Sequence, residues 1–275
     1  MSASIDLSQD EINSFNDNGY LMFRNFLTPS ETKTLQQWAQ EVHELPRNPE
    51  VPWMPYEEVN SAGARVLCRT ENFASHHTGF NALLRGPSIL GILNRLAGEP
   101  MLLFKEKINY KFSGSGGFAP HIDSTAYTHI RKIKHLTILL AVDAATMQNG
   151  GLEVVSGSHK MDVPISRKDN CIKSEWVKAA TWTPCELQAG ELLAFDSHLA
   201  HRSGANKSSQ DRRAVYATYN CKAEGDLREE YYRHRAKEWP ATHMRKDGEA
   251  YATGALRYGF GSPMLSVASG MQLEV

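Results

Sequence analysis

The sequence is poor in cysteine. It has four cysteines in 275 residues, at positions 68, 171, 185 and 221, and none of them form a Cys-x-x-Cys pair. This spacing excludes both a zinc ribbon and a small scaffold held by disulfides. The cysteines are therefore interpreted as reduced and structural. Hydrophobic residues make up 41% and charged residues 22%, which also excludes disordered and collagen-like chains.

The sequence also lacks an excess of charge and a long apolar run. Thirty Lys and Arg oppose 31 Asp and Glu, giving a net charge of −1, so no overall field attracts nucleic acid or an anionic bilayer. The longest apolar stretch, near residues 136–142, is too short to span a membrane. Residues 1–10 have neither the basic nor the apolar region of a secretory signal. We expect a cytoplasmic protein with a small-molecule partner, no nucleic acid and no membrane; the oligomeric state stays unknown.

Helix signals come first along the chain, and strand signals follow. Capping boxes at residues 8–11 and 28–31 predict helices that begin near residues 9 and 29. A third helix is predicted over 88–97, ended by Gly98, and a strand over 20–26. Strands are then predicted over 101–112, 134–142, 152–156, 184–188, 191–196 and 213–220. Strands in succession without helices between them favour an antiparallel sandwich or barrel.

No repeat or linker divides the chain. Four prolines between residues 46 and 55 predict a surface loop over 45–56. We expect a single domain over 1–275, mainly β with flanking α-helices. Its predicted parts are helical elements at about 8–98, a β core at about 100–222, and a helical or loop extension at about 223–275.

One short motif indicates a metal site. The segment 119–123 contains the only His-x-Asp in the sequence, His121 and Asp123. On an extended backbone these two side chains point to the same side. Two histidines and one carboxylate form the facial triad that holds Fe(II) in non-haem oxygenases and leaves positions open for cosubstrate and oxygen. A second histidine is needed, and His198 and His201 both follow a predicted buried strand.

Four motifs in consistent order resemble the phytanoyl-CoA dioxygenase family of Fe(II)- and 2-oxoglutarate-dependent oxygenases. The resemblance covers about residues 10–225 and depends on Phe118-Ala-Pro-His-x-Asp123, Asn149-Gly-Gly-Leu-Glu153, Ser156-Gly-Ser-His159 and His201-Arg-Ser-Gly-x-Asn206 with Arg212. It implies a double-stranded β-helix, a cupin-like jelly roll. A halogenase of this architecture would lack the carboxylate, so Asp123 favours an oxygenase.

The resemblance also implies roles for individual residues. His121, Asp123 and His201 would be the catalytic iron ligands, with His201 chosen over His198 because it heads the family motif. Arg212, rather than its neighbour Arg213, would pair with the C5 carboxylate of 2-oxoglutarate, and Ser203 would donate a hydroxyl to the same group. Tyr127 would contact the cosubstrate. The implied cofactors are Fe(II), 2-oxoglutarate as cosubstrate, O2, and ascorbate as reductant.

Positive side chains upstream of His121 indicate the substrate. Lys105, Lys107, Asn109 and Lys111 alternate along one predicted strand and so share a face. This face is either a solvated sheet surface or a barrel interior that meets the cosubstrate or an anionic substrate. We assign Asn109 to the cosubstrate pocket.

Substrate binding is assigned to Lys107, Arg65 and Arg69. The two arginines belong to a polar cluster that is equally well explained as a surface ion-pair network. The chain also resembles a bacterial branch of the family whose substrate is 2-aminoethylphosphonate, hydroxylated next to phosphorus. The expected activity is therefore hydroxylation of a small anionic or zwitterionic molecule, with release of succinate and CO2. Two alternatives stay open: the same chemistry on an apolar secondary metabolite, and a non-catalytic metal-binding cupin.

Overall fold

The computed structural model describes residues 6–59, 65–130, 134–246 and 248–261. The strands are β1 (Tyr20–Phe23), β2 (Met54–Val59), β3 (Arg65–Glu71), β4 (Met101–Lys111), β5 (His135–Ala141), β6 (Leu152–Val154), β7 (Thr183–Cys185), β8 (Leu192–Asp196), β9 (His201–Ser203) and β10 (Arg212–Cys221). The α-helices are α1 (Gln9–Asn18), α2 (Pro29–His43), α3 (Thr78–Leu84), α4 (Pro87–Ala97), α5 (Ser174–Ala179), α6 (Arg228–Glu238) and α7 (Ala252–Tyr258). Short 3-10 turns include η2 (Asp123–Ala126). Within these ranges, no helix is both long and apolar enough to cross a membrane.

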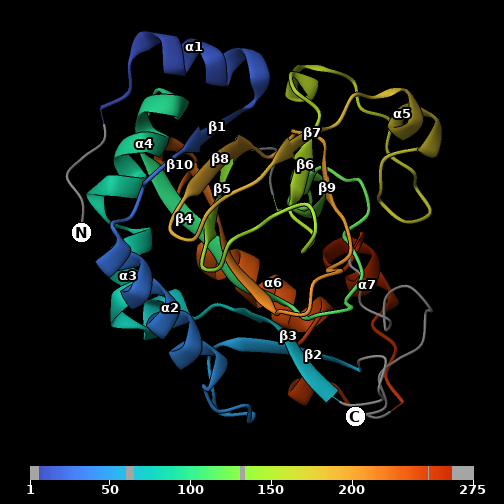
Figure 1. The fold of residues 1–275 in the computed structure, drawn as a ribbon. Coiled ribbons are helices and arrows are strands. Elements are labelled where there is room, and N and C mark those ends of the chain that lie inside the picture. The colour runs from blue at the N-terminus through green and yellow to red at the C-terminus, as the bar shows by residue number, and fades with distance from the viewer. Residues whose placement is uncertain (1–5, 60–64, 131–133, 247, 262–275) are drawn as a thin grey trace.

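Two antiparallel sheets form the centre of the molecule. The major sheet has seven strands in the order β1-β8-β5-β10-β4-β3-β2, and the minor sheet has three in the order β7-β6-β9. In Figure 1, helices α1–α4 lie on one side of the major sheet, and the minor sheet lies on the other. The predicted mainly β fold with flanking helices is therefore observed.

Alternation along the central strands separates the two cores. Leu136, Ile138 and Leu140 of β5 join the large apolar cluster under helices α1–α4. Leu139 and Ala141, on the opposite face, pack with residues of the minor sheet. Side chains of a strand alternate between its two faces. A strand that is buried on both faces therefore has a continuous run of apolar residues in its sequence. The seven residues of β5 are all buried for this reason.

Both predicted capping boxes are confirmed. The Ser8 hydroxyl accepts from the Glu11 N–H, and the Glu11 carboxylate accepts from the Ser8 N–H, at the start of α1. Thr28 and Glu31 make the same reciprocal contacts before α2. Each box satisfies N–H groups that have no partner within the helix. Gly98 ends α4 with φ of 78°, a left-handed conformation that suits glycine.

The edge of the major sheet that β2 and β3 form differs from the prediction. The loop expected over 45–56 gives way to β2 at Met54, and the polar segment after residue 64 forms β3. Pro55 lies inside β2, where it is tolerated because β2 is the edge strand and need not donate on its outer side. Both strands carry charged residues, so their sequences do not show the apolar alternation used to predict the other strands.

A buried ion pair fastens α6 to β4. Glu106, which is fully buried, accepts from both terminal nitrogens of Arg228 and from the Ala74 N–H. Removing one partner of such a pair leaves a buried charge uncompensated. We therefore expect Arg228→Met to lower the free energy of unfolding by about 3–5 kcal/mol, measured by urea denaturation.

The matched control is Arg233→Met on the same helix. Arg233 pairs with Glu229 in an exposed i,i+4 contact, and such pairs contribute less than about 0.5 kcal/mol. Equal midpoints and slopes for both variants would contradict the role given to the buried pair.

Candidate active site

Three side chains form a buried cluster where the loop after β4 pairs with the start of β9. His121 lies in the loop after β4, Asp123 begins η2, and His201 begins β9. The Oδ1 atom of Asp123 lies 3.9 Å from Nε2 of each histidine. One ligand atom from each residue fits within 4.8 Å of the others, and all three residues are buried. We call His121, Asp123 and His201 the triad.

The backbone holds the two histidines together. His121 and His201 form an isolated antiparallel bridge in which each N–H donates to the other's carbonyl at 3.0 Å. Their ring centroids lie 4.2 Å apart. Two segments far apart in the chain are thus fixed side by side before any ion binds.

Each imidazole is oriented by its second nitrogen. His121 Nδ1 lies 2.6 Å from the Ala119 carbonyl, and His201 Nδ1 lies 2.9 Å from the Leu199 carbonyl. A carbonyl can only accept, so each Nδ1 carries the proton and each Nε2 has a free lone pair. Burial lowers the pKa of His121 to about 3 and also lowers the pKa of His201. Both rings are therefore neutral, as metal ligands must be.

The carboxylate of the triad is held in its charged form. Burial alone raises the pKa of Asp123, but His201, Lys105 and Lys107 together outweigh it and lower that pKa below its usual range. The Thr137 hydroxyl also lies 3.4 Å from Asp123 Oδ2. Two neutral imidazole nitrogens and one carboxylate oxygen are the donor set that suits Fe(II).

The competing histidine lies elsewhere. His198 is about half exposed, and its backbone N–H and ring Nδ1 contact Asp196 Oδ1 at 2.8 and 3.2 Å. The structure thus brings His201 to the triad and leaves His198 at the surface.

A second cluster surrounds Arg212. This arginine begins β10, is 5% exposed, and donates from Nη2 to the Gly150 carbonyl at 2.7 Å. Its Nε is buried without a hydrogen-bond partner, and no carboxylate pairs with it in the part of the chain that the structure describes. Arg213 faces the other way and forms a two-pronged ion pair with Asp143. A buried guanidinium with spare N–H groups is suited to bind an incoming carboxylate.

Ser203 and Lys111 belong to the same cluster. Lys111 lies opposite Arg212 in the strand register, and its ammonium donates to Ser203 Oγ at 3.0 Å and to the Gly204 carbonyl at 2.5 Å. The alternation along β4 predicts that Lys111 lies on the cationic face, but no sequence pattern joins it to Ser203. The contact crosses from the major to the minor sheet, which only the fold specifies.

Lys105, Lys107 and Asn109 share one face of β4, as predicted, and it is the face from which Lys111 reaches Ser203 of the minor sheet. Their partners on β10 are Thr218, Tyr216 and Ala214 in that order. Burial lowers the pKa of Lys105 to about 8 and lowers the pKa of Lys107 well below its usual value. Lys105 is buried and Lys107 and Asn109 are partly buried, so this face is turned toward the interior, which decides between the two interpretations of the cationic strand.

The two arginines that were predicted to bind the substrate lie in different environments, one buried and one exposed. Arg69 is buried, lies opposite Asn109, and donates from Nε to Asn109 Oδ1 at 3.0 Å and from Nη1 to Glu71 at 3.4 Å. Arg65 lies at the exposed start of β3 and pairs with Glu57 at 2.5 Å.

A bulge explains the separation. The register between β2 and β3 shifts between Tyr56 and Glu57, so that Tyr56 lies opposite Arg69 but Glu57 lies opposite Leu67. Cys68 is the extra residue on β3, and it reverses the side of the strand to which the following side chains point. Arg65 and Arg69 therefore face opposite ways, although a regular strand would put them on one side. The structure does not bring Arg65 to the cationic face.

Tyr127 lies beneath the cationic face. Its ring is 1% exposed, packs on Phe104 and His135, and has the Lys105 ammonium 4.8 Å from its centroid. Its direct neighbour among the cationic residues is thus Lys105 rather than Arg212.

The C-terminal part of the chain contributes residues that the sequence did not indicate. Arg235 of α6 donates to Glu71 at 2.7 Å in a fully buried pair. The Phe260 ring meets the His121 ring edge-on at 5.5 Å, and the Gly261 carbonyl accepts from the Ala119 N–H at 2.7 Å. These residues carry no motif, and only the packing of α6 and α7 brings them near the triad.

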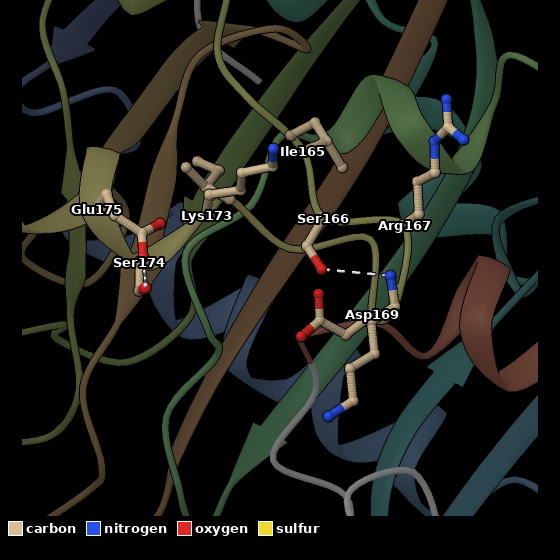
Figure 2. Close-up of a pocket in the computed structure, with 9 residues that line it drawn as sticks. Ile165, Ser166, Arg167, Asp169, Lys173, Ser174 and Glu175 are labelled. Carbon is tan, nitrogen blue, oxygen red and sulfur yellow. Dashed lines mark hydrogen bonds between the residues drawn. The ribbon is translucent and has the colours of Figure 1, made fainter.

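A surface pocket lies apart from the predicted residues. Figure 2 shows it within the loop that precedes and enters α5, where Ser166, Asp169 and Lys173 are among the lining side chains. The loop is joined to the triad segment through the Ile172 N–H, which donates to the Pro120 carbonyl at 2.9 Å. None of the site residues predicted from the sequence lines this pocket.

The fold and the triad define a class of enzyme. Two antiparallel sheets that enclose a His-x-Asp…His triad, with an unpaired arginine nearby, form the jelly roll of Fe(II)- and 2-oxoglutarate-dependent dioxygenases. The phytanoyl-CoA dioxygenase (PhyH) family model matches residues 15–214, and the chain belongs to this family. The predicted family, fold class and enzyme class are confirmed.

Known relatives cover most of the chain. A 2-aminoethylphosphonate dioxygenase from Uncultured bacterium HF130_AEPn_1 is 34% identical over 258 residues, which are 94% of this chain and 98% of the relative. A methylphosphonate hydroxylase from Gimesia maris is 40% identical over 226 residues, which cover 82% of this chain and 85% of the relative. A crystal structure of EctD from S. alaskensis with 2-oxoglutarate and 5-hydroxyectoine has a TM-score of 0.70 at 17% sequence identity. The match covers 79% of this chain and 77% of the EctD chain.

Proposed function

We propose that this protein hydroxylates a C–H bond of a small phosphonate, with 2-aminoethylphosphonate as the first candidate, using Fe(II), 2-oxoglutarate and O2. The observation that carries the proposal is the cationic face of β4 beside the triad, on which Lys105 and Lys111 are buried and Lys107 is partly buried. The two relatives named for phosphonates support the substrate class. We further propose that residues 1–275 act as one dioxygenase domain.

The triad residues would hold the metal. His121 and His201 would bind through Nε2, since each Nδ1 is already bonded to a carbonyl, and Asp123 would bind through a carboxylate oxygen. Bound Fe(II) supplies the activation of O2 for decarboxylation of 2-oxoglutarate, so that one oxygen atom enters succinate, the other enters the substrate C–H bond, and CO2 leaves.

Arg212 would bind the C5 carboxylate of 2-oxoglutarate. Its unpartnered Nε lies in a site from which other carboxylates are absent among the described residues. The Ser203 hydroxyl accepts from Lys111 and from the Phe118 N–H, so its own proton is free to be donated to the same carboxylate. Lys111 thus orients Ser203, and the three side chains form the proposed cosubstrate cradle.

The substrate would lie between the triad and β4. Lys107 would face its anionic group, while Arg69 and Asn109, already bonded to each other, would shape the wall. A charged anchor holds a small molecule with its target C–H near the metal, because such a molecule buries too little apolar surface to be positioned otherwise. Tyr127 would support this wall through Lys105. Arg65 is left out because it pairs with Glu57 at the exposed end of β3.

A substrate panel tests the proposal. Purified protein with Fe(II), 2-oxoglutarate and ascorbate as the proposed reductant is assayed for succinate release with 2-aminoethylphosphonate, methylphosphonate, betaines, amino acids and terpenoids. We expect succinate release to be stimulated most by phosphonates and a hydroxylated phosphonate to appear. Stimulation by uncharged apolar compounds alone would overturn the proposed substrate class.

A further inference from the structure

The positive side chains on and around the inner face of β4 differ in whether the protein gives them hydrogen-bond acceptors. Arg235 pairs with Glu71, Arg69 is bonded to Asn109 and Glu71, and Lys111 donates to acceptors of the minor sheet. The ammonium groups of Lys105 and Lys107 have no such acceptor within the described part of the chain. Each ammonium instead lies over an aromatic ring: Lys105 Nζ is 4.8 Å from the Tyr127 ring centroid, and Lys107 Nζ is 5.2 Å from that of Tyr216.

These two lysines are also well placed relative to the triad. They are two residues apart on β4, so both side chains leave the same face of the strand. Across the sheet, Lys105 lies opposite Thr218, and Thr218 lies opposite Thr137, whose hydroxyl contacts Asp123.

The two lysines are separate from the cosubstrate cradle. Lys111 lies four residues beyond Lys107 on the same strand, which corresponds to about 13 Å along the strand. The cradle and the lysine pair therefore occupy different ends of the inner face of β4. An anion bound by the lysine pair leaves Arg212 and Ser203 available for 2-oxoglutarate.

We propose that Lys105 and Lys107 together form the subsite for the phosphonate group, and that this subsite selects a doubly charged tetrahedral anion over a carboxylate. The inference rests on the proposed function and names the residues and the charge that decide its specificity. Arg69 and Asn109 border the subsite but are hydrogen-bonded to each other.

Charge balance is the physical reason. A buried ammonium without an anion is costly, and a nearby aromatic ring offsets only part of that cost. A dianion matches two ammonium groups and has three oxygens to accept from both. A carboxylate carries one charge, so it leaves the second lysine either unpaired or deprotonated.

Holding two positive charges side by side on β4 has a cost within the protein. Burial is the largest cause of the lowered pKa of each lysine, and for Lys107 the next cause is Lys105 itself; the carboxylates of Asp123 and Glu71 raise both pKa values but do not outweigh these effects. A bound dianion would favour the protonated form of both side chains. The geometry and the pKa directions thus agree on an anion as the missing partner.

The test uses Lys105→Met and Lys107→Met, with Lys237→Met on the exposed side of α6 as control. For each variant the KM values for 2-aminoethylphosphonate and 2-oxoglutarate are measured, together with the far-ultraviolet circular dichroism spectrum. We expect the phosphonate KM to rise about 10- to 100-fold in each subsite variant, the size of one charge-assisted hydrogen bond. The KM for 2-oxoglutarate is expected to stay within about twofold of the wild type, and an unchanged circular dichroism spectrum shows that the variants are folded.

Selectivity is measured with 3-aminopropanoate, which has a carboxylate in place of the phosphonate. Its inhibition constant against 2-aminoethylphosphonate is expected to be much higher than the phosphonate KM in the wild type. The ratio of the two values is expected to fall in both lysine variants. An unchanged ratio, or a rise in the KM for 2-oxoglutarate alone, would overturn the assignment and give the lysines to the cosubstrate.

Direct binding separates this inference from the proposed function. Isothermal titration of 2-aminoethylphosphonate into oxygen-free protein loaded with Fe(II) and 2-oxoglutarate is expected to give heat with the wild type and Lys237→Met, and none with the double lysine variant. If the phosphonate binds but is not hydroxylated, the proposed function fails and the subsite stands. If the wild type binds no phosphonate, the subsite is overturned.

Discussion

Replacing His201 by alanine is expected to abolish both tight Fe(II) binding and turnover. The variant loses one of three ligands and also the ring that stacks beside His121 at 4.2 Å. Loss of a partner that only orients a ligand costs about 10- to 100-fold in metal affinity, so loss of the ligand itself is expected to exceed about 100-fold. Oxygen-free titration with Fe(II) and the rate of succinate formation measure the two effects.

His198→Ala is the matched control. His198 is three residues away, and its ring contacts Asp196 at the surface rather than the triad. This variant is expected to keep wild-type iron affinity and turnover. The opposite pattern, an active His201→Ala and an inactive His198→Ala, would show that the wrong histidine was placed in the triad.

Replacing Arg212 by leucine is expected to raise the KM for 2-oxoglutarate about 30- to 1000-fold while iron stays bound. The guanidinium is buried and has no carboxylate partner among the described residues, so the cosubstrate would be its partner. Truncating one side of a buried charge pair costs about 2–4 kcal/mol, which corresponds to that range. Initial rates over a range of 2-oxoglutarate concentrations give the KM.

The neighbouring arginine provides the control. Arg213 is on the outer face of β10 and pairs with Asp143 through two hydrogen bonds. Arg213→Leu is expected to reduce stability and to leave the KM for 2-oxoglutarate unchanged. Equal increases in KM for both variants would mean that Arg212 acts through the fold and not through the cosubstrate.

Local signals in the sequence predicted the parts of the fold that depend on local physics. The capping boxes at Ser8 and Thr28 fix helix starts through contacts three residues apart. The apolar run of β5 indicates burial on both faces. The spacing of His121 and Asp123, together with the family motif at His201, indicated the triad that the structure assembles.

The parts that were missed depend on contacts distant in sequence. The bulge at Cys68 reverses Arg65 relative to Arg69, and nothing in the local pattern shows where a register shift occurs. Arg235 and Phe260 approach the site only because α6 and α7 pack against it. That Lys105 and Lys107 have no hydrogen-bond acceptor among the described residues is likewise visible only in the folded structure.

Oxygen-18 labelling tests the central claim most directly. The protein is supplied with Fe(II), 2-oxoglutarate, 2-aminoethylphosphonate and labelled O2, and the succinate and the phosphonate product are analysed by mass spectrometry. The account predicts equal amounts of succinate and hydroxylated phosphonate, with one labelled oxygen atom in each. A phosphonate product that forms without succinate, or succinate that forms with the phosphonate left unchanged, would contradict it.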